Sequence, residues 1–169
     1  MSRAAFNERL LPSTLSLASR DLHTLIRLVW ESAEQAEYFH GFVSGYAKAV
    51  FALNTAERVT LASQELMENA LRYSLMAKGI SYELAVSSSE VRVSVGNATI
   101  GSRVAMLQGH LQRIQQDREG TYVAELERSV SGQGRRSMLG LVRICHEANM
   151  VLNVAVENNH VTVVASCRR

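Results

Sequence analysis

Apolar side chains recur along the chain with two different periods, and the changes between them mark the expected elements. Apolar and polar residues alternate over Leu22–Trp30, which predicts a strand. Residues 32–51 are rich in alanine and aromatics at helical spacing, which predicts a helix. A second helix is expected from Thr55, a candidate N-cap residue, to Met76, with Gly79 ending it.

The rest of the chain is expected to form two hairpins with helices between them. Alternation over Ile80–Val86 and Val91–Val95, joined by a serine-rich connector, predicts the first hairpin. The second is expected from Val151–Val156 and Val161–Ser166 around two adjacent asparagines. Three more helices are predicted, with a glycine-bearing loop at 131–137 before the last of them: residues 102–116, 121–130 and 138–148.

This order of elements predicts an α+β fold. Hairpins imply an antiparallel or mixed sheet, and the helices can all cover one of its faces. We therefore expect a two-layer α/β sandwich with a mixed, mostly antiparallel sheet. Residues 21–169 would form this one domain, and residues 1–20, which contain the only proline, Pro12, would form an N-terminal arm.

Composition narrows the classes of ligand and location. The net charge is +2, Lys48 and Lys78 are the only lysines, and the arginines form pairs and no tract, so nucleic acid is not expected as the main ligand. Two cysteines without a CxxC or Cys/His cluster predict neither a disulfide framework nor a zinc site. The N-terminal sequence does not resemble a signal peptide, and no apolar run approaches the roughly 20 residues that span a bilayer. We expect a cytoplasmic protein that contacts no membrane.

Three polar residues on the second predicted helix carry the candidate chemistry. Glu65, Asn69 and Arg72 lie along one border of an apolar stripe that runs from Val59 to Tyr73. An asparagine oxygen suits Mg²⁺, a carboxylate one turn away can orient or deprotonate a hydroxyl, and a guanidinium can neutralise phosphate. On spacing alone, an ordinary solvated helix edge with i,i+4 pairing explains the same pattern equally well.

The stretch Glu65-x-x-x-Asn69-Ala-x-Arg72-Tyr73-Ser resembles the N-box of the GHKL (Bergerat-fold) ATP-binding superfamily, in the form found in anti-sigma-factor serine kinases. The resemblance implies that Glu65 is the catalytic base and that Asn69 is the magnesium ligand. It also places Arg72 and Tyr73 among the residues that bind ATP.

A second stretch, Gly132-x-Gly134-x-x-x-x-Leu139-Gly140-Leu141, resembles the superfamily's glycine-rich lid running into a helix. Glycines there let backbone N–H groups approach phosphates. The resemblance implies that Gly132, Gly134, Gly140 and Leu141 contact the nucleotide, and Arg135 is a candidate phosphate contact. Taken singly, this stretch is better explained by a surface loop before a helix in which Gly140 permits close packing.

The sequence departs from the superfamily at the residue that recognises adenine. An aspartate is expected after the second hairpin strand, where this chain has Gly96-Asn97. The only aspartates are Asp21 and Asp117, and neither follows a predicted strand. Asn97 offers a neutral amide in place of the carboxylate.

Over residues 22–166 the order of elements is similar to the SiaB-like family of small protein kinases in bacterial partner-switching systems. The resemblance implies an ATP- and Mg²⁺-dependent Ser/Thr kinase that phosphorylates a small STAS-like anti-sigma-antagonist. The alternative is a degenerate binding module that keeps the fold and sequesters a regulator without nucleotide turnover. A histidine-kinase fragment is disfavoured, because His146-Glu147 lies in the last predicted helix and no upstream histidine has a suitable context.

Two points stay open at this stage. The aromatic-rich helix within residues 33–51 suits either the core or a homodimer surface, with the core favoured. The kinase interpretation requires that Glu65 and Asn69 face a cleft shared between the helical layer and the glycine-bearing lid.

Overall fold

The computed structural model of the protein describes residues 21–30, 38–76, 79–131 and 138–169, and these contain five strands and five helices. The strands are β1 (His23–Trp30), β2 (Ile80–Val86), β3 (Glu90–Ala98), β4 (Val151–Glu157) and β5 (His160–Arg168). The helices are α1 (Phe39–Val50), α2 (Leu53–Tyr73), α3 (Gly101–Gln116), α4 (Arg118–Val130) and α5 (Leu139–His146).

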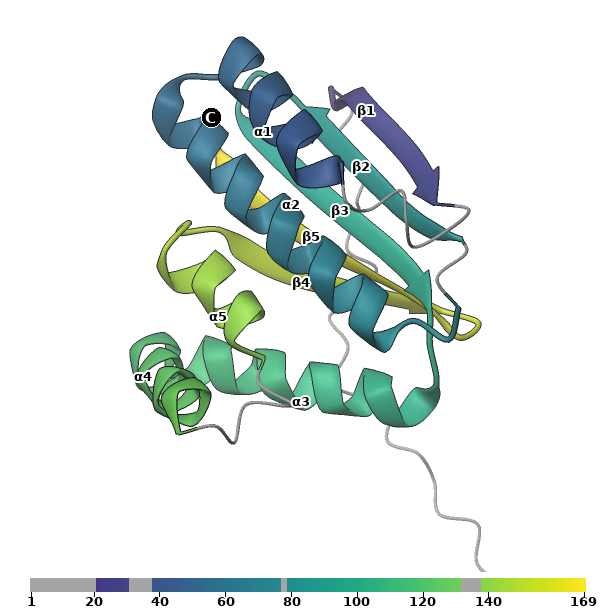
Figure 1. The fold of residues 1–169 in the computed structure, drawn as a ribbon, viewed down its shortest axis with the longest axis vertical. Coiled ribbons are helices and arrows are strands. Elements are labelled where there is room, and N and C mark those ends of the chain that lie inside the picture. The colour runs from purple at the N-terminus through teal and green to yellow at the C-terminus, as the bar shows by residue number, and fades with distance from the viewer. Residues whose placement is uncertain (1–20, 31–37, 77–78, 132–137) are drawn as a thin grey trace, which may run out of the picture.

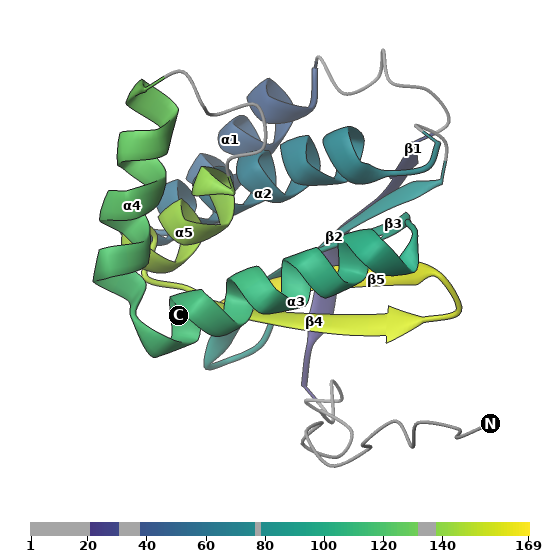
Figure 2. The same ribbon diagram turned by 90° about the horizontal axis from the view of Figure 1, so that it is seen from below.

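The strands form one sheet in the order β1-β2-β3-β5-β4. All four described strand pairings are antiparallel, and both predicted hairpins, β2–β3 and β4–β5, are present. The helices lie over one face of the sheet, with α1 and α2 side by side, α5 next to α2, and α3 and α4 beyond it (Figures 1 and 2). The predicted α+β two-layer sandwich is confirmed.

Strand alternation places the core between the sheet and the helices. Ile80, Tyr82 and Leu84 of β2 point to the helical side and are almost fully buried. The Phe39 ring packs edge-on against Trp30 and Tyr82, with ring centroids 5.1 Å and 4.8 Å apart. These contacts fix α1 over the β1–β2 end of the sheet.

The aromatics of α1 divide between the core and the surface. Phe39 is buried and Tyr46 is half-buried, whereas Tyr38 and Phe42 are 78% and 51% exposed. The favoured assignment of this segment to the core therefore holds for only part of it. Residues 32–37 of the predicted helix, like the proposed N-terminal arm, lie outside the described residues.

Several helix boundaries differ from the sequence prediction. Helix α2 begins at Leu53 without a side-chain cap, so the assignment of Thr55 as N-cap is wrong. It ends at Tyr73 instead of Met76, because Ser74 is extended and the Leu75 N–H donates to the Ala98 carbonyl of β3 at 3.0 Å. Contact with the sheet thus ends this helix earlier than its sequence pattern predicts.

Helix α4 begins earlier than predicted, at Arg118 instead of residue 121. Asp117 is its N-cap, and the carboxylate accepts a hydrogen bond of 2.9 Å from the Gly120 N–H. One of the chain's two aspartates thus has a local structural role.

None of the helices in the described ranges has both the length and the apolar character that crossing a bilayer requires.

Candidate functional site

Helix α2 carries Glu65 and Asn69 on the side that faces the first turn of α5. Glu65 is 8% exposed and Asn69 is half-buried. A Cβ added to Gly140 of α5 would lie 2.2 Å from Glu65 Oε2 and 3.4 Å from Asn69 Nδ2. The absence of a side chain at residue 140 therefore lets α5 pack directly on both of these side chains.

A polar cleft of about 260 Å³ opens between α2, α4 and α5. Its lining contains four charged side chains, two of them acidic and two basic: Glu65, Glu68, Arg72 and Arg143. Asn69, Ser129, Leu139 and Gly140 complete it. Arg72 is exposed, so its guanidinium lies at the solvent side of the cleft. Glu65 and Asn69 thus face a cleft that the first turn of α5 also lines, and the glycine loop of the predicted condition, residues 132–137, lies outside the described residues.

Arg143 is a site residue that the sequence analysis missed. Its Nη1 forms an ion pair with Glu65 Oε1, and its Nε and Nη2 donate to the two carboxylate oxygens of Glu147 at 3.0 Å and 3.1 Å. Burial raises the pKa of Glu65, and the nearby Arg143 charge opposes that shift without cancelling it. The only sequence signal was position, since Arg143 follows Gly140 by one helical turn.

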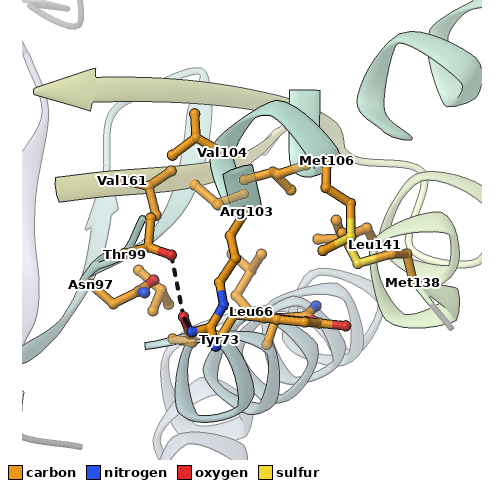
Figure 3. Close-up of a pocket in the computed structure, with 15 residues that line it drawn as sticks. Leu66, Tyr73, Asn97, Thr99, Arg103, Val104, Met106, Met138, Leu141 and Val161 are labelled. Atoms are coloured by element: carbon orange, nitrogen blue, oxygen red, sulfur yellow. Dashed lines mark hydrogen bonds between the residues drawn. The ribbon is translucent and has the colours of Figure 1, made fainter. Parts of the chain in front are cut away.

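Figure 3 shows a second, mainly apolar cavity of about 40 Å³. It is enclosed by α2, β3, α3, β5 and the start of α5. Tyr73, Asn97 and Leu141, three of the predicted nucleotide contacts, all line it. Asn69 borders both this cavity and the polar cleft, and its buried Nδ2 has no hydrogen-bond partner among the described residues.

Arg103 of α3, which the sequence analysis also missed, enters this cavity (Figure 3). Its Nη1 donates to the Tyr73 carbonyl at 2.6 Å and to the Ser74 carbonyl at 3.4 Å. Thr99 Oγ1 donates to the same Tyr73 carbonyl at 3.3 Å. These bonds tie the start of α3 to the end of α2 and satisfy the last carbonyls of that helix.

The residues fit the phosphate and metal end of a nucleotide site. An amide, a carboxylate and two arginines offer the oxygen ligands that Mg²⁺ prefers and the cations that bind phosphate. The base end is closed, because 40 Å³ is far below the roughly 300 Å³ of small ligand pockets. Asn97 is 5% exposed, and its Nδ2 donates to the neighbouring Ala98 carbonyl at 3.2 Å.

The beginning of α5 is also held by α4. Glu125 is buried, and its Oε2 accepts a hydrogen bond of 3.2 Å from the Met138 N–H, directly before α5. The same carboxylate forms an ion pair of 2.5 Å with Arg128. Gly132, Gly134 and Arg135, the other predicted phosphate contacts, lie outside the described residues.

Comparison with known proteins gives a likeness of fold. No protein-family model and no curated protein matches the sequence. A chain of the crystal structure of the SiaB–SiaC complex from Pseudomonas aeruginosa superposes with a TM-score of 0.58 at 16% sequence identity. The match covers 86% of this chain and 91% of that one. The protein therefore shares, over most of both lengths, the fold of a chain from a SiaB–SiaC complex, in line with the SiaB-like element order of its sequence.

Proposed function

We propose that this protein is a cytoplasmic ATP- and Mg²⁺-dependent Ser/Thr protein kinase of a bacterial partner-switching system, which phosphorylates a small STAS-like partner. One observation carries the proposal: Glu65 and Asn69 converge with Gly140 at the edge of a polar cleft. The likeness to a chain of the SiaB–SiaC complex supports a protein partner. The SiaB-like resemblance of the sequence supports the reaction.

Three cleft residues have roles in such a transfer: Glu65, Asn69 and Arg72. The acceptor hydroxyl oxygen forms a bond to the γ-phosphorus of ATP, the bond from that phosphorus to the leaving ADP oxygen breaks, and Glu65 takes the hydroxyl proton. The Asn69 oxygen would be a ligand of Mg²⁺, which neutralises phosphate charge when bound. Arg72 lies in the same cleft and can hold phosphate oxygens.

Adenine binding requires the apolar cavity to widen. Tyr73, Asn97 and Leu141 already line the cavity, and Arg103 would have to move with α3 to admit a base. The Asn97 amide would replace the superfamily's aspartate as the polar contact. A neutral amide is a weaker acceptor than a carboxylate, so we expect modest affinity for ATP.

The small cavity and the absent aspartate favour a second candidate function. In it the protein binds a regulatory partner stoichiometrically and turns over no nucleotide. The cleft then serves only packing between α2 and α5.

Calorimetry with Mg²⁺ and a non-hydrolysable ATP analogue separates the two functions. We expect binding heat in the wild type. In Asn69→Ala we expect the affinity to fall about tenfold or more, because the substitution removes a metal ligand; tenfold corresponds to about 1.4 kcal/mol of binding free energy. Asn54→Ala changes an exposed asparagine at the start of the same helix and should bind like the wild type. No heat at millimolar nucleotide would instead support the binding module.

A further inference from the structure

Both oxygens of the carboxylate that we assign as the base are contacted by residues of α5. Glu65 Oε2 is covered by the backbone of Gly140, where an added Cβ would lie 2.2 Å away. Glu65 Oε1 is engaged by the Arg143 guanidinium. A partner hydroxyl therefore has to compete with Gly140 and Arg143 for these oxygens while α5 keeps this position.

Arg143 does not depend on Glu65 for its own position. Two of its N–H groups donate to Glu147, one helical turn further along α5. Glu147 also accepts a hydrogen bond of 3.1 Å from the Tyr122 hydroxyl of α4. The Tyr122 ring stacks on the His146 ring, with the ring centroids 4.2 Å apart. These contacts hold the guanidinium against α5 and α4. If α5 moved away from α2, Arg143 would travel with it and leave Glu65 unpaired.

Glu65 would be a stronger base once the pair opens. Glu68 and Glu147 are the other carboxylates near Glu65, and both make its ionised form less stable. A buried carboxylate without Arg143 binds a proton more tightly, as a general base must. The ion pair thus weakens the base in the closed arrangement.

We propose that Arg143 is a positioning residue that holds Glu65 in a resting state, and that phosphotransfer requires the first turn of α5 to withdraw and break the Glu65–Arg143 pair. This inference rests on the proposed kinase function. It assigns the resting contact to residues of α2 and α5 and names Arg143 as the residue that sets basal activity.

Basal ATP hydrolysis by the full-length chain with Mg²⁺-ATP tests the inference, because water then replaces the partner hydroxyl as acceptor. Arg143→Gln should raise kcat by about fivefold to tenfold with an unchanged KM for ATP, since losing the pair removes a coupling worth about 1 kcal/mol. Arg143→Lys keeps the charge without the planar fork and should give a smaller rise. Arg58→Gln, a half-buried arginine of α2 outside the cleft lining, should match the wild type.

The outcomes separate the two proposals. Calorimetry on the same proteins reports nucleotide binding, and circular dichroism confirms that each variant is folded; if Arg143→Gln does not fold, Arg143→Lys decides. Intact binding with an unchanged kcat makes Arg143 merely structural, and a lower kcat makes it a phosphate contact; either result overturns the resting-state role alone. No nucleotide binding by any of the proteins overturns the kinase function, and the role of Arg143 falls with it.

Discussion

At residue 140 a missing side chain decides how closely two helices approach. Most glycines on the helices have open space around the position of a Cβ, as Gly109 of α3 does. Gly140 instead faces Glu65 and Asn69 at contact distance. The close packing that the sequence analysis gave as the alternative role of Gly140 is therefore present in the structure.

Gly140→Ala and Gly109→Ala form a matched pair of substitutions. Alanine should stabilise α3 by roughly 0.5–1 kcal/mol at residue 109, because glycine is a poor helix former. At residue 140 the same gain is offset, since the methyl group must displace a carboxylate that Arg143 holds. We expect the free energy of unfolding to differ by about 1 kcal/mol or more between the variants, measured with urea. Equal stabilisation by both would contradict the close packing at Gly140.

The chemistry of the site was only partly predictable from residue types. Glu65 and Asn69 could be found because both belong to one helix and one motif. Arg143 and Arg103 could not, because their partners are set by how α5 and α3 lie against α2. Such contacts depend on packing between segments far apart in the sequence.

At the scale of elements, α4 has an unusual distribution of side chains. All thirteen of its residues are described, and Glu125 alone is buried, whereas Val123, Leu126 and Val130 are exposed. Its apolar pattern correctly predicted a helix but would have placed the wrong side inward. The buried Glu125 carboxylate is stabilised by the hydrogen bonds that it accepts from Arg128 and from the Met138 N–H.

Glu125→Ala should loosen the start of α5. A buried hydrogen bond to a charged group contributes about 1.5–3 kcal/mol to stability, so we expect the free energy of unfolding to fall by about that amount. Hydrogen–deuterium exchange of the α5 amides should quicken as well. Glu127→Ala, an exposed glutamate of the same helix, should stay within about 0.5 kcal/mol of the wild type. Similar effects of both substitutions would mean that Glu125 does not anchor α5.

At the scale of the whole molecule, element order was enough to predict the two-layer architecture, because hairpins and one-sided helices leave few alternatives. The volumes of the two cavities could not be predicted in the same way. The apolar cavity depends on how α3 lies against α2 and the sheet, and the polar cleft on how α4 and α5 lie against α2, which no local pattern encodes. The likeness to a chain of the SiaB–SiaC complex supports the overall arrangement at low sequence identity.

Global stability should fall in alkali because of one core residue. Burial raises the pKa of Tyr82 to about 12, with its hydroxyl 2.9 Å from Ser63 Oγ. The unfolded chain then loses this proton near pH 10 and the folded protein only near pH 12, so stability is retained below pH 10 and lost between these values. The loss should be about 2–3 kcal/mol. Urea unfolding at several pH values measures this loss in the free energy of unfolding. In Tyr82→Phe the free energy should change less between pH 10 and 12. An equal decline in that variant would show that groups other than Tyr82 cause it.

The position of β5 in the sheet has a consequence for how the protein is made. Its partner β3 comes much earlier in the chain, yet Glu90 pairs with Arg168 and Ala98 with His160. Val161 and Val163 of β5 form one wall of the apolar cavity. During synthesis, Glu65 and Asn69 emerge from the ribosome long before that wall exists. Such distant pairing is slow to form, so a nascent chain is expected to gain the apolar cavity only late in folding.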